Sequence, residues 1–85
     1  MTLQQQIRDF VTSNFYVADP NTLEDRTSLL DQGIIDSTGV LEVIMFIEST
    51  FGVTVEDSEM LPENLDSIER IAAFVARKKA LPIAA

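Results

Sequence analysis

The chain of 85 residues is long enough for one small domain, and its 46% apolar content can fill a single modest core. It contains no Cys and no His, which excludes disulfides, thiolate or imidazole catalysis, and zinc sites with nitrogen or sulfur ligands; we therefore expect neither an enzyme nor a metal protein. The net charge of −8 argues against binding to nucleic acid or anionic membranes.

The sequence also shows neither the pattern of an N-terminal targeting signal nor that of a membrane-spanning helix. No N-terminal stretch combines basic residues with a long apolar run, and no apolar segment approaches the roughly 20 residues that a spanning helix needs. We therefore expect a cytoplasmic protein.

Charge is distributed unevenly along the chain. Residues 37–66 hold seven acidic residues and no basic one, whereas residues 67–85 hold one acidic and four basic residues. The middle of the chain should form an acidic surface, which favours partner proteins with basic surfaces.

The first predicted element is an amphipathic helix that ends near Asn14. Thr2 is a suitable N-cap, and apolar side chains recur behind it at helical spacing, namely Leu3, Ile7, Phe10 and Val11.

A long first loop follows, because helical periodicity is lost over residues 15–36 and turn-forming residues take its place. Scattered apolar side chains should anchor this loop to the core: Leu23, Leu29, Leu30, Ile34 and Ile35. Loops of this length are often functional.

Residues 37–51 give the clearest helical pattern, and Gly52 provides a C-terminal stop. One stripe about 100° wide is apolar and suited to the core: Val40, Val43, Ile44, Ile47 and Phe51. The opposite side mixes acidic and apolar side chains that have no obvious core to enter: Thr38, Leu41, Glu42, Met45 and Glu48.

The remaining elements are a short extended link at residues 53–55, a short or irregular helix within residues 56–64, and a last amphipathic helix that begins after an Asp66 or Ser67 cap. Its apolar face comprises Ile68, Ile71, Ala72 and Val75. The predicted fold is therefore all-α: a small four-helix bundle of three main helices and one short helix, with a long first loop. We expect one domain over residues 1–80 and an unstructured tail over residues 81–85.

Ser37 is the candidate functional residue, since it stands in the first turn of the best-predicted helix. A phosphodiester on its hydroxyl would lie near the unpaired N–H groups and the positive end of the helix dipole. The simpler interpretation is that Ser37, or Asp36 before it, is an ordinary N-cap.

The segments 29–37 (LLDQGIIDS), 41–48 (LEVIMFIE) and 51–53 (FGV) together resemble the acyl carrier protein family. The resemblance extends from Leu29 to about Val75. In that family the serine of the Asp-Ser pair carries 4′-phosphopantetheine, which a phosphopantetheinyl transferase attaches from coenzyme A with magnesium. By this resemblance Ser37, with Asp36 beside it, is the cofactor site, and the thiol missing from the chain belongs to the prosthetic group.

The family resemblance also implies a partner face on the helix that follows the serine. Residue by residue it comprises Thr38, Leu41, Glu42, Met45 and Glu48, the side that periodicity leaves facing away from the core. The implied partners are the transferase, an acyl- or amino acid-activating ligase, and downstream transferases with basic surfaces. A carrier that visits several enzymes is expected to be a monomer.

Two readings of the cargo remain open. The spacing of Gly33, Asp36, Ser37 and Gly39 is similar to that of D-alanyl carrier proteins, which implies an amino acid loaded by a dedicated ligase. A fatty-acyl cargo is the other reading, for which a cleft could be lined by Val43, Ile44, Phe46 and Ile47, although these residues also suit a close-packed core.

A different class of function is an acidic helical module that binds proteins without any prosthetic group, with Ser37 acting only as a cap. Under this hypothesis, Ser37→Ala leaves partner binding intact.

Overall fold

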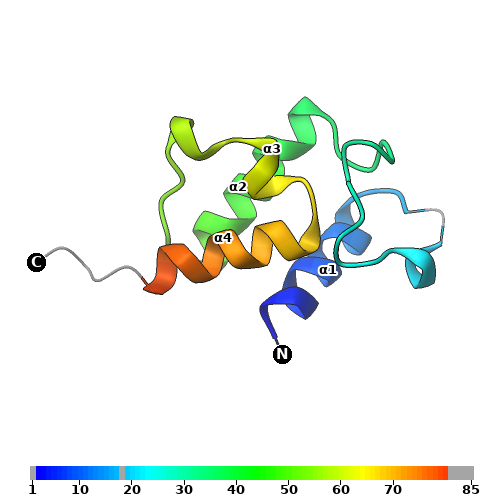
Figure 1. Ribbon diagram of the computed structural model, residues 1–85, viewed down its shortest axis with the longest axis horizontal. Helices are drawn as coiled ribbons and strands as arrows, with labels where there is room; N and C mark the ends of the chain where they lie inside the picture. The colour runs from blue at the N-terminus through cyan, green and yellow to red at the C-terminus, as the bar shows by residue number, and fades with distance from the viewer. Residues whose placement is uncertain (1, 18, 81–85) are drawn as a thin grey trace, which may run out of the picture.

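The computed structural model describes residues 2–17 and 19–80, and within these residues the regular structure is entirely helical. The helices are α1 (Leu3–Asn14), α2 (Ser37–Phe51), α3 (Pro62–Leu65) and α4 (Ile68–Ala80), with single 3-10 turns at Pro20–Thr22 and Asp57–Glu59. The predicted all-α bundle of three main helices and one short helix is confirmed (Figure 1). The predicted tail, residues 81–85, lies outside the described residues, and the domain boundary at residue 80 stays a prediction.

Helix α1 begins where the sequence predicts, because Thr2 and Gln5 satisfy each other's backbone donors. The Gln5 N–H donates to Oγ1 of Thr2 at 3.1 Å, and the Thr2 N–H donates to Oε1 of Gln5 at 3.2 Å. This capping box pairs two amide groups that a helix N-terminus otherwise leaves open. The buried face of α1 is formed by Ile7 and Val11.

Helix α2 covers the predicted residues and ends at Gly52. This glycine has φ +69°, in the left-handed region that suits glycine, and its N–H donates to the Glu48 carbonyl at 3.1 Å. Two residues of the predicted core stripe, Val40 and Phe51, are only half-buried and pack against the edge of the core.

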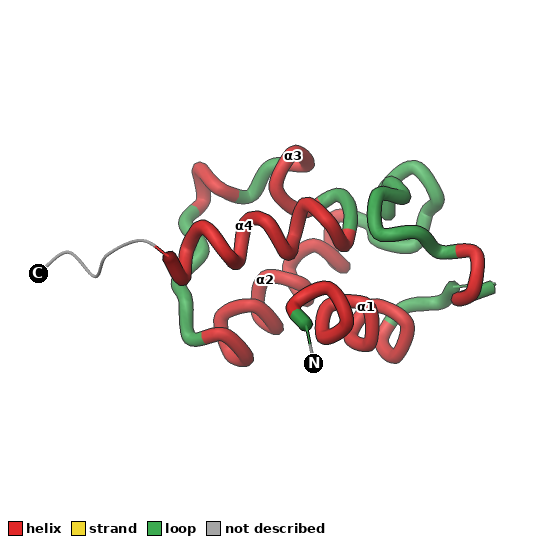
Figure 2. Tube along the Cα trace, turned by 60° about the horizontal axis from the view of Figure 1, so that its bottom comes forward, coloured by secondary structure: helices red, strands yellow, loops and turns green. Residues whose placement is uncertain are grey.

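The core lies around α4, which packs most closely against α1 and α3 and also contacts α2 (Figures 1 and 2). Its fully buried side chains include Ile68, Ile71, Phe74 and Val75. The N–H of Arg70 donates to Oγ of Ser67 at 3.0 Å, so Ser67 is the residue that caps α4 through its side chain. None of the helices in the described part of the chain is long and apolar enough to cross a membrane.

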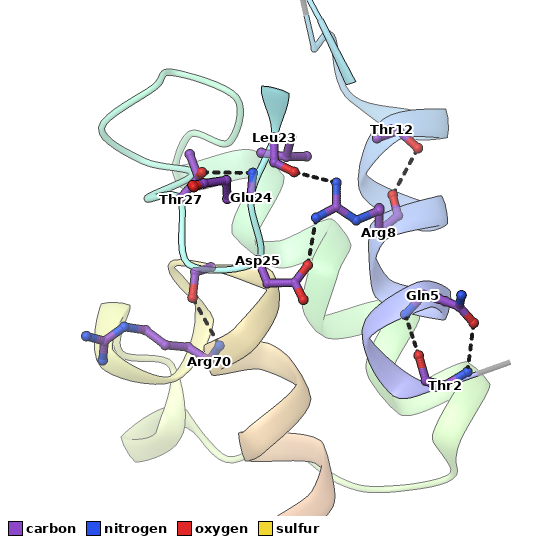
Figure 3. A network of polar contacts seen from close by, with 10 residues as sticks. Thr2, Gln5, Arg8, Thr12, Leu23, Glu24, Asp25, Thr27 and Arg70 are labelled. Carbon is purple, nitrogen blue, oxygen red and sulfur yellow. Dashed lines mark hydrogen bonds and ion pairs between the residues drawn. The ribbon is translucent and has the colours of Figure 1, made fainter. Parts of the chain in front are cut away.

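The long first loop is ordered by polar contacts as well as by buried leucines. Arg8 of α1 donates to the Leu23 carbonyl and to Oδ1 of Asp25, both at 2.6 Å (Figure 3). The Asp25 carbonyl in turn accepts the N–H of Glu69 at 2.8 Å. Because these contacts join α1, the loop and α4, the loop is held at both sides of the bundle.

Candidate functional site

Asp36 and Ser37 have different roles at the start of α2. Oδ1 of Asp36 accepts the N–H of Gly39 at 2.7 Å, so Asp36 is the N-cap. Ser37 is the first helical residue, is exposed, and its hydroxyl has no hydrogen-bond partner among the described residues. The hydroxyl is therefore available to solvent and to an enzyme, beside the positive end of the helix dipole.

Close packing beneath the first turn constrains the backbone of α2 next to Ser37. Gly39 is buried, and a Cβ placed on it would lie 3.0 Å from Cγ2 of Ile35 and 3.0 Å from Cε1 of Phe15. A side chain at residue 39 would require Phe15 or Ile35 to shift by a few tenths of an ångström. The glycine after the Asp-Ser pair is therefore explained by packing.

The segment that leads into Ser37 is folded around Leu29, which is fully buried. Its carbonyl accepts the N–H groups of Ile34 and Ile35 at 2.9 and 3.2 Å, and Gly33 has φ +70° within this turn. Buried Ile35 then precedes Asp36 directly. The anchoring predicted for Leu29 and Ile35 is confirmed, whereas the anchoring predicted for Leu30 is wrong, because its side chain is exposed. The two buried side chains fix the chain directly before Asp36 and Ser37.

Asp66 ties this same segment to the α3–α4 corner. Its Oδ2 accepts the Ser28 hydroxyl at 2.7 Å, its Oδ1 accepts the Leu30 N–H at 2.9 Å, and its backbone carbonyl accepts the Leu29 N–H at 2.7 Å. The two regions are far apart in sequence, so sequence periodicity carries no signal for this contact. Asp66 was predicted only as a possible helix cap.

A small, mainly apolar cavity of about 260 Å³ opens beside Ser37, between α2 and α3. Apart from Ser37, it is lined by Leu30, Val40, Met60, Leu61, Pro62 and Leu65. Sequence reasoning missed this set, although Leu61 and Pro62 formed an apolar pair in an acidic stretch. The residues considered for a fatty-acyl cleft do not line this cavity: Val43, Ile44 and Ile47 are buried core, and Phe46 stacks on Phe10.

The predicted partner face is largely exposed. Leu41 and Met45 retain 54% and 68% of their accessible surface, and Thr38 and Glu42 are also exposed. Exposed apolar side chains of this size next to a free carboxylate are typical of a surface that binds proteins.

Glu48 differs from the other four predicted residues. It is half-buried, and its Oε2 accepts the N–H of Val55 at 2.9 Å, which holds the extended link of residues 53–55 against the end of α2. This carboxylate therefore has an internal structural contact. Its predicted role in binding partners stays a prediction.

The acidic segment after α2 is attached to α4 by an ion pair. Nζ of Lys78 donates to Oε1 of Glu59 at 2.8 Å, and this hydrogen bond, together with one from the Glu56 N–H, lowers the pKa of Glu59 below its usual value. The described residues contain no group of three or more His, Cys, Asp or Glu side chains arranged to hold a metal ion.

The fold and the exposed serine at a helix start define a small helical carrier domain. Residues 5–75 match the family described as the phosphopantetheine attachment site. The chain belongs to this family, and it is a carrier protein for acyl or aminoacyl groups.

The chain is similar to both kinds of carrier. It is 29% identical to an acyl carrier protein of Campylobacter hominis, covering 88% of this chain and 91% of that protein. It is 30% identical to a D-alanyl carrier protein of Streptococcus uberis, covering 88% and 92%, and 32% identical to one of Abiotrophia defectiva, covering 62% and 67%.

Proposed function

We propose that Ser37 is the residue to which 4′-phosphopantetheine is attached, and that the protein presents a cargo on this arm to partner enzymes. The observation that carries the proposal is the division of roles at α2: Asp36 caps the helix, which leaves the exposed Ser37 hydroxyl without a hydrogen-bond partner in the described structure. An attachment serine needs both exposure and a fixed position.

The residues present fit such an arm. The phosphate would lie at the start of α2, where the helix dipole favours an anion by about 0.3–1 kcal/mol at an exposed site. The prosthetic group supplies the thiol that this Cys-free chain lacks. The chain itself positions the backbone at Ser37 through Gly39 and the Leu29 turn, and the apolar cavity beside Ser37 could cover an apolar part of the arm or its cargo.

The partner enzymes in this proposal are a phosphopantetheinyl transferase, a ligase that activates the cargo, and transferases that use it. Similarity to D-alanyl carriers supports an amino acid loaded by a dedicated ligase. The apolar lining around Leu61 and Val40 supports an apolar acyl group instead. Loading assays with adenylating ligases and either amino acids or fatty acids separate the two cargo classes. The cytoplasmic location is part of the same proposal and is checked by cell fractionation.

The deciding experiment is intact mass spectrometry after co-expression with a broad-specificity phosphopantetheinyl transferase. We expect the wild type to gain the mass of one phosphopantetheine and Ser37→Ala to gain none. Ser49→Ala is the matched control, because Ser49 is also exposed on α2 and should leave modification unchanged. Wild-type protein that stays unmodified beside an active transferase would overturn the proposal and favour the unmodified binding module.

A further inference from the structure

A second apolar surface lies on the side of α2 that faces α1, and it shares only some of its residues with the predicted partner face. Two adjoining hollows, both shallow and widely open to solvent, share four lining residues. We call the surface formed by both hollows the α1–α2 groove; its centre is formed by the four shared residues, Phe10, Asn14, Phe46 and Thr50.

The floor of the α1–α2 groove consists of two aromatic rings. Phe10 of α1 and Phe46 of α2 stack with centroids 4.1 Å apart and an interplanar angle of 14°. Both are half-buried, so part of each ring still faces the groove. Met45 forms one wall and is 68% exposed, which extends the apolar surface beyond the rings.

The charged residues that line the groove are all acidic. Asp9 lines it from α1 and Glu42 lines it from α2, both carboxylates are exposed, and none of the residues lining the two hollows is basic. Arg8, next to Asp9 in sequence, donates instead to the Leu23 carbonyl and to Asp25 in the first loop (Figure 3). The acids of the groove thus have no neutralising partner along its walls.

We propose that the α1–α2 groove binds a basic amphipathic helix of a partner enzyme. Apolar side chains of that helix would cover Phe10, Phe46 and Met45, while Lys or Arg residues on its flanks would lie beside Asp9 and Glu42. Aromatic rings offer a large apolar contact area, methionine adapts its shape to apolar side chains, and carboxylates on both walls specify the sign of the partner's charge.

The groove continues the predicted partner face, since Glu42 and Met45 belong to both. It adds α1 to the surface, so a partner held here would contact two helices. In this respect the inference deepens the proposed carrier function, but the groove exists on the chain without any arm.

The test uses the full, unmodified chain and a fluorescent helical peptide of about 18 residues, with leucines along one face and lysines on both flanks. We expect amide chemical shift changes in NMR spectra to centre on Phe10, Asn14, Phe46 and Thr50. The variant Thr50→Lys, which puts a positive charge into the groove at an exposed position, should weaken binding about tenfold. A peptide of the same composition with scrambled order should bind much more weakly.

The matched control is Ala73→Lys, which makes the same change in charge at an exposed position of α4 outside the groove. At 0.15 M salt the screening length is about 8 Å, so this variant should leave the dissociation constant within about twofold of wild type. Equal weakening by both variants, equal binding of the scrambled peptide, or shift changes centred away from the groove would each overturn the proposal. Thermal unfolding verifies that both variants fold, and intact mass reports the modification of Ser37 separately, so failure here is distinguishable from failure of the carrier proposal.

Discussion

Substitution of Asp66 by Ala should loosen the segment that leads into Ser37. The carboxylate accepts two hydrogen bonds from the first loop, from the Ser28 hydroxyl and the Leu30 N–H. Hydrogen bonds to charged groups contribute about 1.5–3 kcal/mol each, and we take the lower end because both contacts are partly exposed. The expected loss in the free energy of unfolding is therefore about 2–3 kcal/mol.

Chemical denaturation and thermal scans measure this loss directly. For a domain of this size, each kcal/mol lowers Tm by about 4–8 °C, so Asp66→Ala should lower it by roughly 10–20 °C. Total stability of about 5–15 kcal/mol leaves a folded protein for comparison. Asp66→Asn keeps one acceptor oxygen and should lose less than the alanine variant.

Asp31→Ala is the control for charge, because Asp31 is exposed in the same loop and its carboxylate makes no hydrogen bond within the described structure. It should change stability by less than about 0.5 kcal/mol. If Asp66→Ala and Asp31→Ala had equal effects, the loop anchor would be unimportant and our reasoning would be refuted. Slower modification of Ser37 in the Asp66 variant alone would link the anchor to the site.

Two further predictions concern packing and pH. Gly39→Ala should gain about 1 kcal/mol of helix propensity, but the new methyl group pushes against Phe15 and Ile35, and overpacking costs about 1–3 kcal/mol. We expect a net loss in the free energy of unfolding, measured by chemical denaturation. A variant more stable than wild type would contradict the close contact. The hydrogen bond from Lys78 lowers the pKa of Glu59 in the folded protein. The ionised Glu59 therefore stabilises the fold fully at pH values above its ordinary pKa of about 4.3, and this stabilisation is lost as the pH falls through the lower pKa of the folded state. Glu59→Gln keeps an acceptor for the Glu56 N–H, and its deficit relative to wild type at pH 7 should disappear in that acidic range; a deficit that persists there would show that charge is not the cause.

The helices were predictable because their signals are local. Thr2 marks the start of α1, apolar spacing indicates the buried side of α2, and Gly52 ends α2, all within a few residues of each boundary. The exposure of Leu41 and Met45 followed from the same periodicity. The family resemblance added the meaning of the Asp-Ser pair, which periodicity alone left as an ordinary cap.

The surroundings of Ser37 were not predictable, because they depend on contacts between distant parts of the chain. Asp66 reaches Ser28 and Leu30 across more than 30 residues, and the cavity wall comes from Leu61 and the short helix α3. Neither contact leaves a periodic pattern in the sequence. Glu48 shows the same limit, since helical spacing placed it correctly on α2 but could not reveal that Val55 folds back onto it.

These contacts change how the net charge of −8 should be understood. Asp36, Glu48 and Asp66 each accept hydrogen bonds that hold the chain in its fold. Asp9 and Glu42 are exposed on the two walls of the α1–α2 groove. Loss of a fold-holding carboxylate should act on stability first, whereas loss of an exposed carboxylate without such a contact should act on association rate and its salt dependence. The acidic residues of the chain therefore include carboxylates that hold the fold and others that make no such contact, and Asp36 is both fold-holding and exposed beside Ser37.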